Sequence, residues 1–490
     1  MHRAAFDGIE NTIGRCMQLG DIPGVVVGVV DRSGTRYSAG FGVSHVERAA
    51  SPDEQSRFCI QSCTKSLTAA VVATMVDDQM VEWDRPIRSY VPGFRMFDAA
   101  ASEAISFRDI LAHRTGLPAG HDWMRITSPH TRQNLLDRLQ YLEPIIPLRS
   151  AFQYSNLMYV IAGALLERIT GVTWEESVRR RILEPLRMAD TDVTGFVGDD
   201  DTRAMPDYSR SEQGRVRFPS LWEPPILQAL LSVASAPCGG VVSTIRDLCA
   251  WVQFQLGAQG FPPIVVSRET LSALHAVQIH CPALIREPET SDGGVAMGWF
   301  VQAYQGQRLI AHWGGGFGPT VCSFMPDAGV GVCVHSNRAE SSFHAINAIM
   351  LNAYDRMLGL EPLPWVERWA SQMAATASVP SLQAAAGAGS ARGRPAAGLA
   401  GRFTHPGYGI VEIRAEPTGT SLHYQGLRFD LHQGDGDSLE MILACKVPAI
   451  LKSWWGVRNM TAARNTGGDV GSVAIPFEPA APAVMFVRQS

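Results

Sequence analysis

A serine and a lysine three positions apart, in the pattern Ser62-x-x-Lys65, are the first residues whose types and spacing could do chemistry. A short strand is expected over residues 58–61, and an apolar helical pattern continues from Ser62 to about Met75. Residues i and i+3 share one face of a helix, so the lysine amine is expected beside the serine hydroxyl. A serine becomes a good nucleophile when a neighbouring base takes its proton, and a buried amine can be that base. The pattern therefore predicts a serine nucleophile at the start of a helix.

Lysine is rare in this chain, and its rarity singles out Lys65. Of 42 Lys and Arg residues only three are lysine, the other two being Lys446 and Lys452. An ammonium taken out of water can lose its proton near neutral pH, whereas a guanidinium cannot. The alternative interpretation is an exposed, polar first turn of a helix. No second Ser-x-x-Lys pattern occurs in the sequence.

Two further motifs follow along the chain, Tyr154-x-Asn156 and His312-x-Gly314. In this order, after the serine and lysine pair, they resemble the three-motif set of the serine β-lactamase and penicillin-binding-protein superfamily. Three motifs in the same order are far more specific than any one of them. The resemblance implies a serine acyl-enzyme hydrolase or acyltransferase that acts on an ester or an amide, including peptides that contain D-amino acids.

The resemblance extends beyond the three motifs. Residues 107–117 are similar to the R-x-L-L-x-H-x-S-G-L stretch of the class C β-lactamase-like branch, and residues 237–244 resemble its G-G-hydrophobic-S-T turn. That branch also holds D-aminopeptidases, carboxylesterases and acyltransferases. The similarity covers about residues 5–360, and the remaining tail is similar to the small lipocalin-like barrels that often follow this domain.

The resemblance implies a role for each matching residue. Ser62 is the acyl-accepting nucleophile, and Lys65 holds or takes its proton. Tyr154 opposes Ser62 as a phenolic acid and base, and Asn156 orients Lys65 and can bond a substrate amide. His312 lines the far wall of the site on an edge strand. The alternatives are that Tyr154 and Asn156 are ordinary residues at a helix start, and that His312 is an ordinary strand histidine.

The same resemblance implies an oxyanion hole and a binding wall. The backbone N–H groups of Ser62 and Gly315 are expected to form the oxyanion hole. Trp313, Gly314 and Gly316 are expected to contact substrate. The glycine-rich segment around them lacks the G-x-G-x-x-G spacing and the lysine of a phosphate loop, so no nucleotide site is expected.

The third motif departs from the classical pattern. Classical β-lactamases carry Lys-Thr/Ser-Gly there, and the lysine ammonium binds a substrate carboxylate. Here His312 is expected to be mostly neutral at pH 7, and Trp313 removes the hydroxyl. This departure predicts weak carboxylate recognition and poor β-lactam hydrolysis.

The elements that must position these residues follow a simple order. Strands open the chain, helices fill the middle, and strands with a terminal helix close it. This order predicts an α+β fold, with one antiparallel sheet flanked by terminal helices and an all-helical region inserted at about residues 66–185. Later strands are expected over residues 296–304, 309–312, 320–325 and 330–334, and a last helix over 342–358.

The composition divides the chain into three parts. Residues 1–372 are expected to form the hydrolase domain, and 373–398 are rich in Ala, Gly and Ser, like a linker. Residues 399–490 show short strand patterns separated by turns, which predicts a small β-barrel. Its aromatic residues look exposed, and this exposure predicts docking on the larger domain; they are Tyr408, Tyr424, Trp454 and Trp455.

Composition also excludes several classes of function. The net charge is −5 and the pI about 6.2, so no nucleic-acid partner is expected. No apolar run reaches the length of a membrane span, and the N-terminus lacks the apolar core of a secretory signal. The nine scattered cysteines form no C-x-x-C pair, which predicts reduced thiols in a cytoplasmic protein, with no metal and no cofactor.

Two other functions remain open at this point. One is a biosynthetic transacylase or penicillin-binding-protein-type thioesterase, in which an amine outcompetes water and the acyl donor can be bound to a carrier protein. The other is a catalytically weak penicillin-binding-like sensor, although an intact serine, lysine and tyrosine set argues against it. In each case the partner is a small-molecule or peptide acyl substrate, and the sequence leaves the oligomeric state open.

Overall fold

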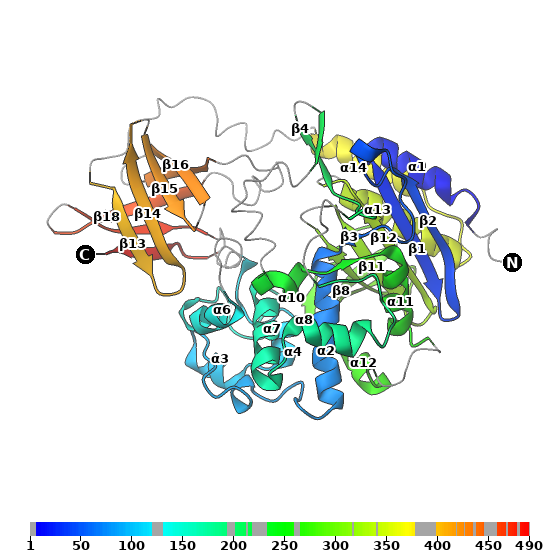
Figure 1. The fold of residues 1–490 in the computed structure, drawn as a ribbon, viewed down its shortest axis with the longest axis horizontal. Coiled ribbons are helices and arrows are strands. Elements are labelled where there is room, and N and C mark those ends of the chain that lie inside the picture. Colours follow the sequence, from blue (N-terminus) through cyan, green and yellow to red (C-terminus); the bar gives the residue numbers. More distant parts are fainter. Residues whose placement is uncertain are drawn as a thin grey trace.

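The computed structural model describes residues 6–489 with internal gaps, and Figure 1 draws its ribbon. The residues outside the description are 1–5, 120–130, 194–200, 212–213, 218–232, 259–264, 316–317, 340–341, 378–397, 418, 426, 435–437, 445–457, 467–468, 478–480 and 490. Among the described residues no single helix is long and apolar enough to cross a membrane, although the bent pair Asn156–Thr170 and Trp174–Leu183 together reaches that length and apolarity.

An eight-stranded antiparallel sheet organises the first part of the chain, in the order β2-β1-β12-β11-β10-β9-β8-β7. Its strands are β1 (Gly24–Asp31), β2 (Gly34–Gly42), β7 (Ile279–Cys281), β8 (Thr290–Val295), β9 (Phe300–Tyr304), β10 (Gln307–Gly314), β11 (Thr320–Met325) and β12 (Val330–Ser336). The opening strand β1 pairs with the late strand β12, with Val25 opposite Ser336. The sheet is therefore built from both ends of the domain, which confirms the predicted fold.

Both faces of the sheet are covered by helices. Val25 and Val27 of β1 pack in one apolar cluster with α1 (Ile9–Gly20), α13 (Ser342–Met357) and α14 (Trp365–Ala377). Val26 alternates to the other face, where the core continues into α11 (Ile245–Gln255) and the helical region. Because β1 is buried on both faces, its sequence is a nearly continuous run of valines rather than an alternating pattern.

The helical region lies between the first two strands and the rest of the sheet. Its helices are α2 (Thr64–Asp77), α3 (Ala99–Ala104), α4 (Phe107–Leu111), α6 (Arg132–Arg138), α7 (Asn156–Thr170), α8 (Trp174–Val178), α10 (Ala236–Gly239) and α12 (Arg268–His275). Short helical turns include η3 (Gln61–Cys63), η4 (Ile87–Ser89), η6 (Leu139–Tyr141), η7 (Arg179–Leu183) and η9 (Val233–Ser235). Helix α7 is buried from Leu157 to Leu166, because apolar residues occupy every face of it.

Two sequence predictions about the sheet were wrong. Residues 296–304 were expected to form one strand, but the chain turns at Gly298, whose φ of +83° and close approach to Ala69 of α2 suit a glycine. The strand that carries His312 was expected at an edge, but β10 lies inside the sheet between β9 and β11. Only its last three residues project beyond β9, whose pairing with β10 ends at Phe300 opposite Ala311.

The tail forms a closed barrel of eight antiparallel strands, which confirms the predicted small barrel (Figure 1). They are β13 (Gly401–His405), β14 (Gly409–Glu416), β15 (Gly419–Tyr424), β16 (Leu427–Gln433), β17 (Ser438–Leu443), β18 (Arg458–Arg464), β19 (Val470–Ile475) and β20 (Val484–Arg488). Tyr408 and Tyr424 are buried and pack against Phe477, so the prediction that they are exposed was wrong. Eight strands enclose just enough room for side chains, and aromatic rings occupy it here. Trp454 and Trp455 lie outside the described residues.

The barrel contacts the helical region through its first turn. Arg138 of α6 donates to the carbonyl oxygen of Gly407 at 3.3 Å. A Cβ on Gly407 would lie 3.0 Å from Tyr141 and 3.1 Å from Leu142, so the turn packs closely against η6. Helix α14 extends to Ala377 and so continues past residue 373, where the linker was expected to start.

Candidate active site

The backbone around Ser62 is held in an unusual conformation. Strand β3 (Phe58–Cys59) pairs with β6 (Val242–Ser243) and leads into η3. Gln61, directly before the serine, has a φ of +50°, in the left-handed region that costs a non-glycine residue energy. The Gln61 side chain donates to the carbonyl oxygen of Gly318 at 3.1 Å. The turn therefore presents Ser62 at the start of α2, where the sequence pattern predicted it.

Lys65 is fully buried and surrounded by oxygen atoms. Its Nζ donates to Ser62 Oγ at 2.9 Å, to Asn156 Oδ1 at 2.7 Å and to the carbonyl oxygen of Cys238 at 2.7 Å. An ammonium has three protons, and these three acceptors use all of them. The side chain is therefore fixed beside Ser62.

Tyr154 faces the same serine from the other side. Its hydroxyl donates to Ser62 Oγ at 3.0 Å, and its ring centroid lies 5.0 Å from Lys65 Nζ. Asn156 is the first residue of α7, and its side chain accepts from Lys65 rather than capping the helix. Ser155 stands at the N-cap position, but its hydroxyl has no hydrogen-bond partner within the described chain. The helix start therefore has Ser155 at its N-cap position without a side-chain cap, and the roles of Tyr154 and Asn156 stay predictions.

His312 lies on β10 with only 2% of its surface exposed. Its Nδ1–H donates to the carbonyl oxygen of Gly298 at 2.9 Å. Burial, then the charge of Lys65, lower the pKa of His312 to about 3, although the bond to Gly298 opposes them. The imidazole is therefore neutral at pH 7, and its Nε2 carries a lone pair. That atom has no hydrogen-bond partner among the residues described.

The glycines after His312 bring β10 against the nucleophile. A Cβ on Gly314 would collide with the carbonyl oxygen of Ile60, so only glycine allows this approach. The Cys63 thiol donates to the carbonyl oxygen of His312 at 3.3 Å, which ties the serine turn to the same strand. Gly315 follows at the strand end, beside the half-exposed ring of Phe343. Gly316 lies outside the described residues.

Trp313 points to the opposite face of β10 from His312, because side chains alternate along a strand. Its indole Nε1–H donates to Asn347 of α13 at 2.8 Å, and 6% of the residue is exposed. The ring also lies 6.1 Å from that of Phe300. The structure thus places Trp313 behind the strand, and its contact with substrate stays a prediction.

We refer to Ser62, Lys65, Tyr154 and Asn156 as the helical wall of the site, and to His312–Gly315 as the sheet wall. Aromatic rings fill the space where the two walls meet. Phe300 lies 6.4 Å from Tyr154 and 5.4 Å from His312, between ring centroids. Phe152 lies 6.0 Å from Phe300. Two sequence signals could have indicated these rings. Phe152 stands two residues before Tyr154, and Phe300 lies in a predicted strand.

Two further groups at the helical wall were not among the predicted site residues. The carbonyl oxygen of Cys238 bonds Lys65, and a backbone group leaves no signal in residue type. His113 stacks on Tyr154 at a centroid distance of 4.4 Å and accepts from the Ser155 N–H at 3.1 Å. Within the described residues, no group of three or more His, Cys, Asp or Glu side chains is placed to hold a metal ion.

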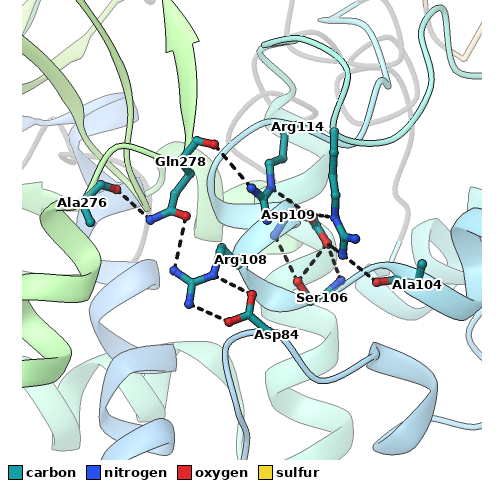
Figure 2. Close-up of polar contacts among 9 residues, drawn as sticks. Asp84, Ala104, Ser106, Arg108, Asp109, Arg114, Ala276 and Gln278 are labelled. Carbon is teal, nitrogen blue, oxygen red and sulfur yellow. Dashed lines mark hydrogen bonds and ion pairs between the residues drawn. The ribbon is translucent and has the colours of Figure 1, made fainter.

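A buried carboxylate supports the segment that carries His113 (Figure 2). Asp109 of α4 has a side chain with 0% exposure, and it forms ion pairs with Arg114 at 2.6 Å and Arg149 at 2.8 Å. Its carboxylate also accepts from the backbone N–H and the hydroxyl of Ser106, in a capping box that starts the helix. Burial would raise the pKa of Asp109, but the bonds from Arg149 and Ser106 and the charge of Arg114 outweigh it and lower that pKa.

A model of the β-lactamase family matches residues 9–354. The unguisins hydrolase ungD' of Aspergillus campestris is 30% identical over 356 residues, which cover 70% of this chain and 63% of that protein. The chain therefore spans less than two thirds of the length of this relative.

Solved structures share the fold. The octameric penicillin-binding protein homologue from Pyrococcus abyssi has a TM-score of 0.61 at 19% identity, over 98% of this chain and 99% of that one. The D-amino acid amidase from Ochrobactrum anthropi SV3, complexed with D-phenylalanine, has a TM-score of 0.56 at 22% identity, over 72% of this chain and 98% of that one.

Proposed function

Since the chain belongs to the β-lactamase family of serine hydrolases, we propose that it is an acyl-enzyme hydrolase that opens an amide or ester bond through Ser62. One observation carries the proposal: Ser62 Oγ lies 2.9 Å from Lys65 Nζ and 3.0 Å from the Tyr154 hydroxyl. Two proton-exchanging groups on one hydroxyl are what an activated nucleophile needs.

The surroundings of Lys65 divide the two roles. Its three acceptors suit the ammonium form, in which Lys65 donates to Ser62 and holds a positive charge beside the Tyr154 ring. In this proposal the Tyr154 hydroxyl first loses its own proton to solvent, and its oxygen then takes the Ser62 proton while Oγ bonds to the acyl carbon. The same proton then passes from Tyr154 to the leaving amine or alkoxide. Water repeats the sequence in reverse and releases the acid, which regenerates free Ser62.

The tetrahedral intermediate carries its negative charge on the former carbonyl oxygen. The backbone N–H groups of Ser62 and Gly315 are our candidates for the donors that stabilise it. The packing of Gly314 on Ile60 supports this assignment, because it brings the end of β10 to the serine turn.

The substrate we propose is a D-amino-acid amide or a peptide that contains such a residue. The amidase from Ochrobactrum anthropi, whose fold this chain shares, is named for D-amino acids, and the Aspergillus relative is named a hydrolase. The neutral His312 supports the same choice, because it supplies no cation for a carboxylate next to the reacting bond. Compartment and carrier-bound donors stay predictions from the sequence.

The proposal is tested by labelling and turnover together. A fluorophosphonate is expected to add once to the protein, as measured by intact mass, and Ser62→Ala is expected to abolish the adduct. Cys63→Ala is the matched control, because Cys63 is the neighbouring nucleophile and is buried against the sheet. Turnover of D- and L-phenylalanine amide by the wild type then measures the stereochemical preference.

Labelling of the Ser62→Ala variant, or loss of labelling in the Cys63→Ala variant with Ser62 intact, would reject Ser62 as the nucleophile. Equal turnover of the two amides would leave the hydrolase proposal standing and remove its D-specific part. Release of the acyl group only in the presence of an added amine would favour the transacylase alternative.

A further inference from the structure

His113 occupies a place that packing alone does not explain. It follows Ala112, the C-cap residue of α4, its φ of +54° falls in the left-handed region, and only 1% of its surface is exposed. Its ring lies 4.4 Å from that of Tyr154, tilted by 29°, and 5.1 Å from that of Tyr159. A residue in a costly backbone conformation persists when its surroundings hold it there.

Two hydrogen bonds from this one residue bracket Tyr154. The Gln153 N–H donates to the His113 carbonyl oxygen at 2.8 Å, and the Ser155 N–H donates to His113 Nδ1 at 3.1 Å. The residues directly before and after Tyr154 are therefore bonded to the same partner, which also covers one face of its ring. The backbone of Tyr154 is fixed at both ends, and its ring is fixed between.

Ion pairs of the Asp109 carboxylate, which is shown in Figure 2, connect the two chain segments that carry His113 and Tyr154. Asp109 bonds Arg114, the residue after His113, and Arg149, which stands five residues before Tyr154. The Arg149 N–H also donates to the Arg114 carbonyl oxygen at 2.7 Å. The bracket thus rests on a buried carboxylate rather than on a free loop.

The protonation of His113 fits a supporting role. Burial, then the charges of Lys65 and His312, lower the pKa of His113 well below its usual value, so the ring is neutral. Because Nδ1 accepts a hydrogen bond, the proton is on Nε2, which is buried and has no partner among the described residues. An unpaired buried N–H lowers stability, so stability alone does not account for a histidine here.

We propose that His113 is a positioning residue that holds the Tyr154 hydroxyl on Ser62 Oγ, through the bracket on Gln153 and Ser155. This inference rests on the proposed function, because it gives Tyr154 the proton transfer. The reacting oxygens lie at 3.0 Å, and a shift of about 1 Å in such a contact can lower a rate by about 100-fold. His113 contacts Tyr154 and its two neighbours in the chain, so in this proposal it acts through Tyr154.

Two amide variants separate the bracket from general packing. In His113→Asn the side-chain oxygen can replace Nδ1 as the acceptor for the Ser155 N–H, and asparagine tolerates a positive φ. In His113→Gln the amide reaches the position of Nε2 instead and leaves the Ser155 N–H without its acceptor. Both variants remove the ring and both stay polar, so they differ in the bracket.

We expect kcat for an amide substrate to fall by about 100-fold in His113→Gln but only by about tenfold in His113→Asn, with KM nearly constant in both variants. The rate of fluorophosphonate labelling should fall in the same order, and the pH profile of kcat should shift only in the Gln variant. His275→Asn is the control, because it removes another buried histidine, whose ring bonds Gln255 and packs on Trp299 and Phe324. It should change thermal stability and leave kcat as in the wild type.

Equal kcat in the Asn and Gln variants, or a change confined to KM, would overturn the inference. So would a lower melting temperature in His113→Gln with the wild-type kcat at 25 °C, since that result describes a structural residue. These outcomes are distinct from failure of the proposed function, which appears as labelling of Ser62→Ala. If Ser62→Ala is inert and His113→Gln labels at the wild-type rate, only the positioning role fails.

Discussion

The helical wall and the sheet wall meet near two buried histidines that carry their protons on opposite ring nitrogens. At the helical wall, His113 Nδ1 accepts from the Ser155 N–H, so the proton stays on Nε2. At the sheet wall, His312 Nδ1–H donates to the Gly298 carbonyl oxygen, so Nε2 is bare. Burial keeps both rings neutral by lowering each pKa. At the helical wall the acceptor nitrogen of His113 is already hydrogen-bonded. At the sheet wall the acceptor nitrogen of His312 has no partner among the described residues.

The difference shows that backbone groups decide what a buried imidazole does. A neighbouring N–H makes the ring an acceptor at that nitrogen, and a neighbouring carbonyl makes it a donor. The helical wall is closed, because the bonds of Lys65 and Tyr154 are made within it. The sheet wall keeps one acceptor for a partner. The predictions below test this contrast between a closed wall and an open one.

The largest effect is expected at the closed wall, from Lys65→Arg. Three acceptors lie 2.7–2.9 Å from Nζ, and a planar guanidinium cannot reach all three from the same place. We expect kcat/KM for an ester or amide to fall by about 1,000-fold, nearly as far as in Lys65→Ala. Steady-state kinetics with correctly folded protein, checked by circular dichroism, measures it. More than a tenth of the wild-type rate in the Arg variant would show that the wall is not closed.

The second effect concerns substrates with a carboxylate next to the reacting bond. A neutral His312 offers no charge-assisted bond, which is worth about 1.5–3 kcal/mol. We expect kcat/KM for nitrocefin to be about 100-fold below that for p-nitrophenyl acetate. Colorimetric assays of the two substrates on one enzyme preparation measure the ratio. Comparable rates would mean that a cation reaches the sheet wall from elsewhere.

The third effect distinguishes the two histidine tautomers. It uses the Gln and Asn variants of His312, on the sheet wall. In His312→Gln the side-chain oxygen can stand at the place of Nε2, whereas in His312→Asn the amide N–H replaces the donor to Gly298. If a substrate N–H binds at Nε2, Gln retains the wild-type KM and Asn raises KM by about tenfold. At His113 the Asn variant is expected to retain more activity than the Gln variant. The ranking of the Asn and Gln variants by kcat/KM should therefore be opposite at the two histidines. The same order at both sites would contradict opposite tautomers.

The smallest effect is on stability against acid. Both histidines have a folded pKa below the unfolded value of about 6.5, so the unfolded chain binds protons that the folded chain does not. Stability is therefore retained above pH 6.5 and lost as the pH falls below it, by about 1.4 kcal/mol per pH unit for each histidine once it is protonated in the unfolded chain.

Urea unfolding between pH 7 and pH 5 measures this slope. Removing one of the two rings by His113→Asn should lower the slope by the share of one histidine, and His312→Gln should do the same. A slope unchanged in either variant would show that the ring is already charged in the folded protein. The two walls should thus respond alike to acid although they differ in chemistry.

Much of this site follows from residue spacing, and the parts that do not follow are backbone effects. The i, i+3 spacing predicted that Ser62 and Lys65 lie side by side, as they do. The Cys238 carbonyl and the His113 bracket depend on which chain segments meet in space, and single residue types do not encode that. The catalytic roles implied by the family motifs stay predictions until the variants above are measured.

The fold was predictable where the hydrophobic pattern is local. Helix α7 and strand β1 stand where their apolar runs indicated, and the order of elements gave the antiparallel sheet. The edge position of β10 was an expectation from the family resemblance, and it was wrong because β9, within the strand predicted over residues 296–304, pairs with β10 on its outer side. Tyr424 was misjudged because an eight-stranded barrel turns alternate strand residues inward, and a sequence with unknown strand pairing does not show which set that is. Tyr408 lies in the turn between β13 and β14, and its stacking on Phe477 joins positions far apart in the sequence.

The bond between Ser155 and His113 joins positions 42 residues apart, and this separation bears on how the enzyme family can diversify. The cost in entropy of closing a chain segment grows only with the logarithm of its length, about 0.6 kcal/mol for each doubling. Insertions or deletions between Arg114 and Arg149 would therefore add little to this entropic cost, provided that the bracket and the ion pairs of the two arginines with Asp109 are kept. Related chains could differ in that stretch and so acquire new substrates, while Tyr154 keeps its place beside Ser62 Oγ.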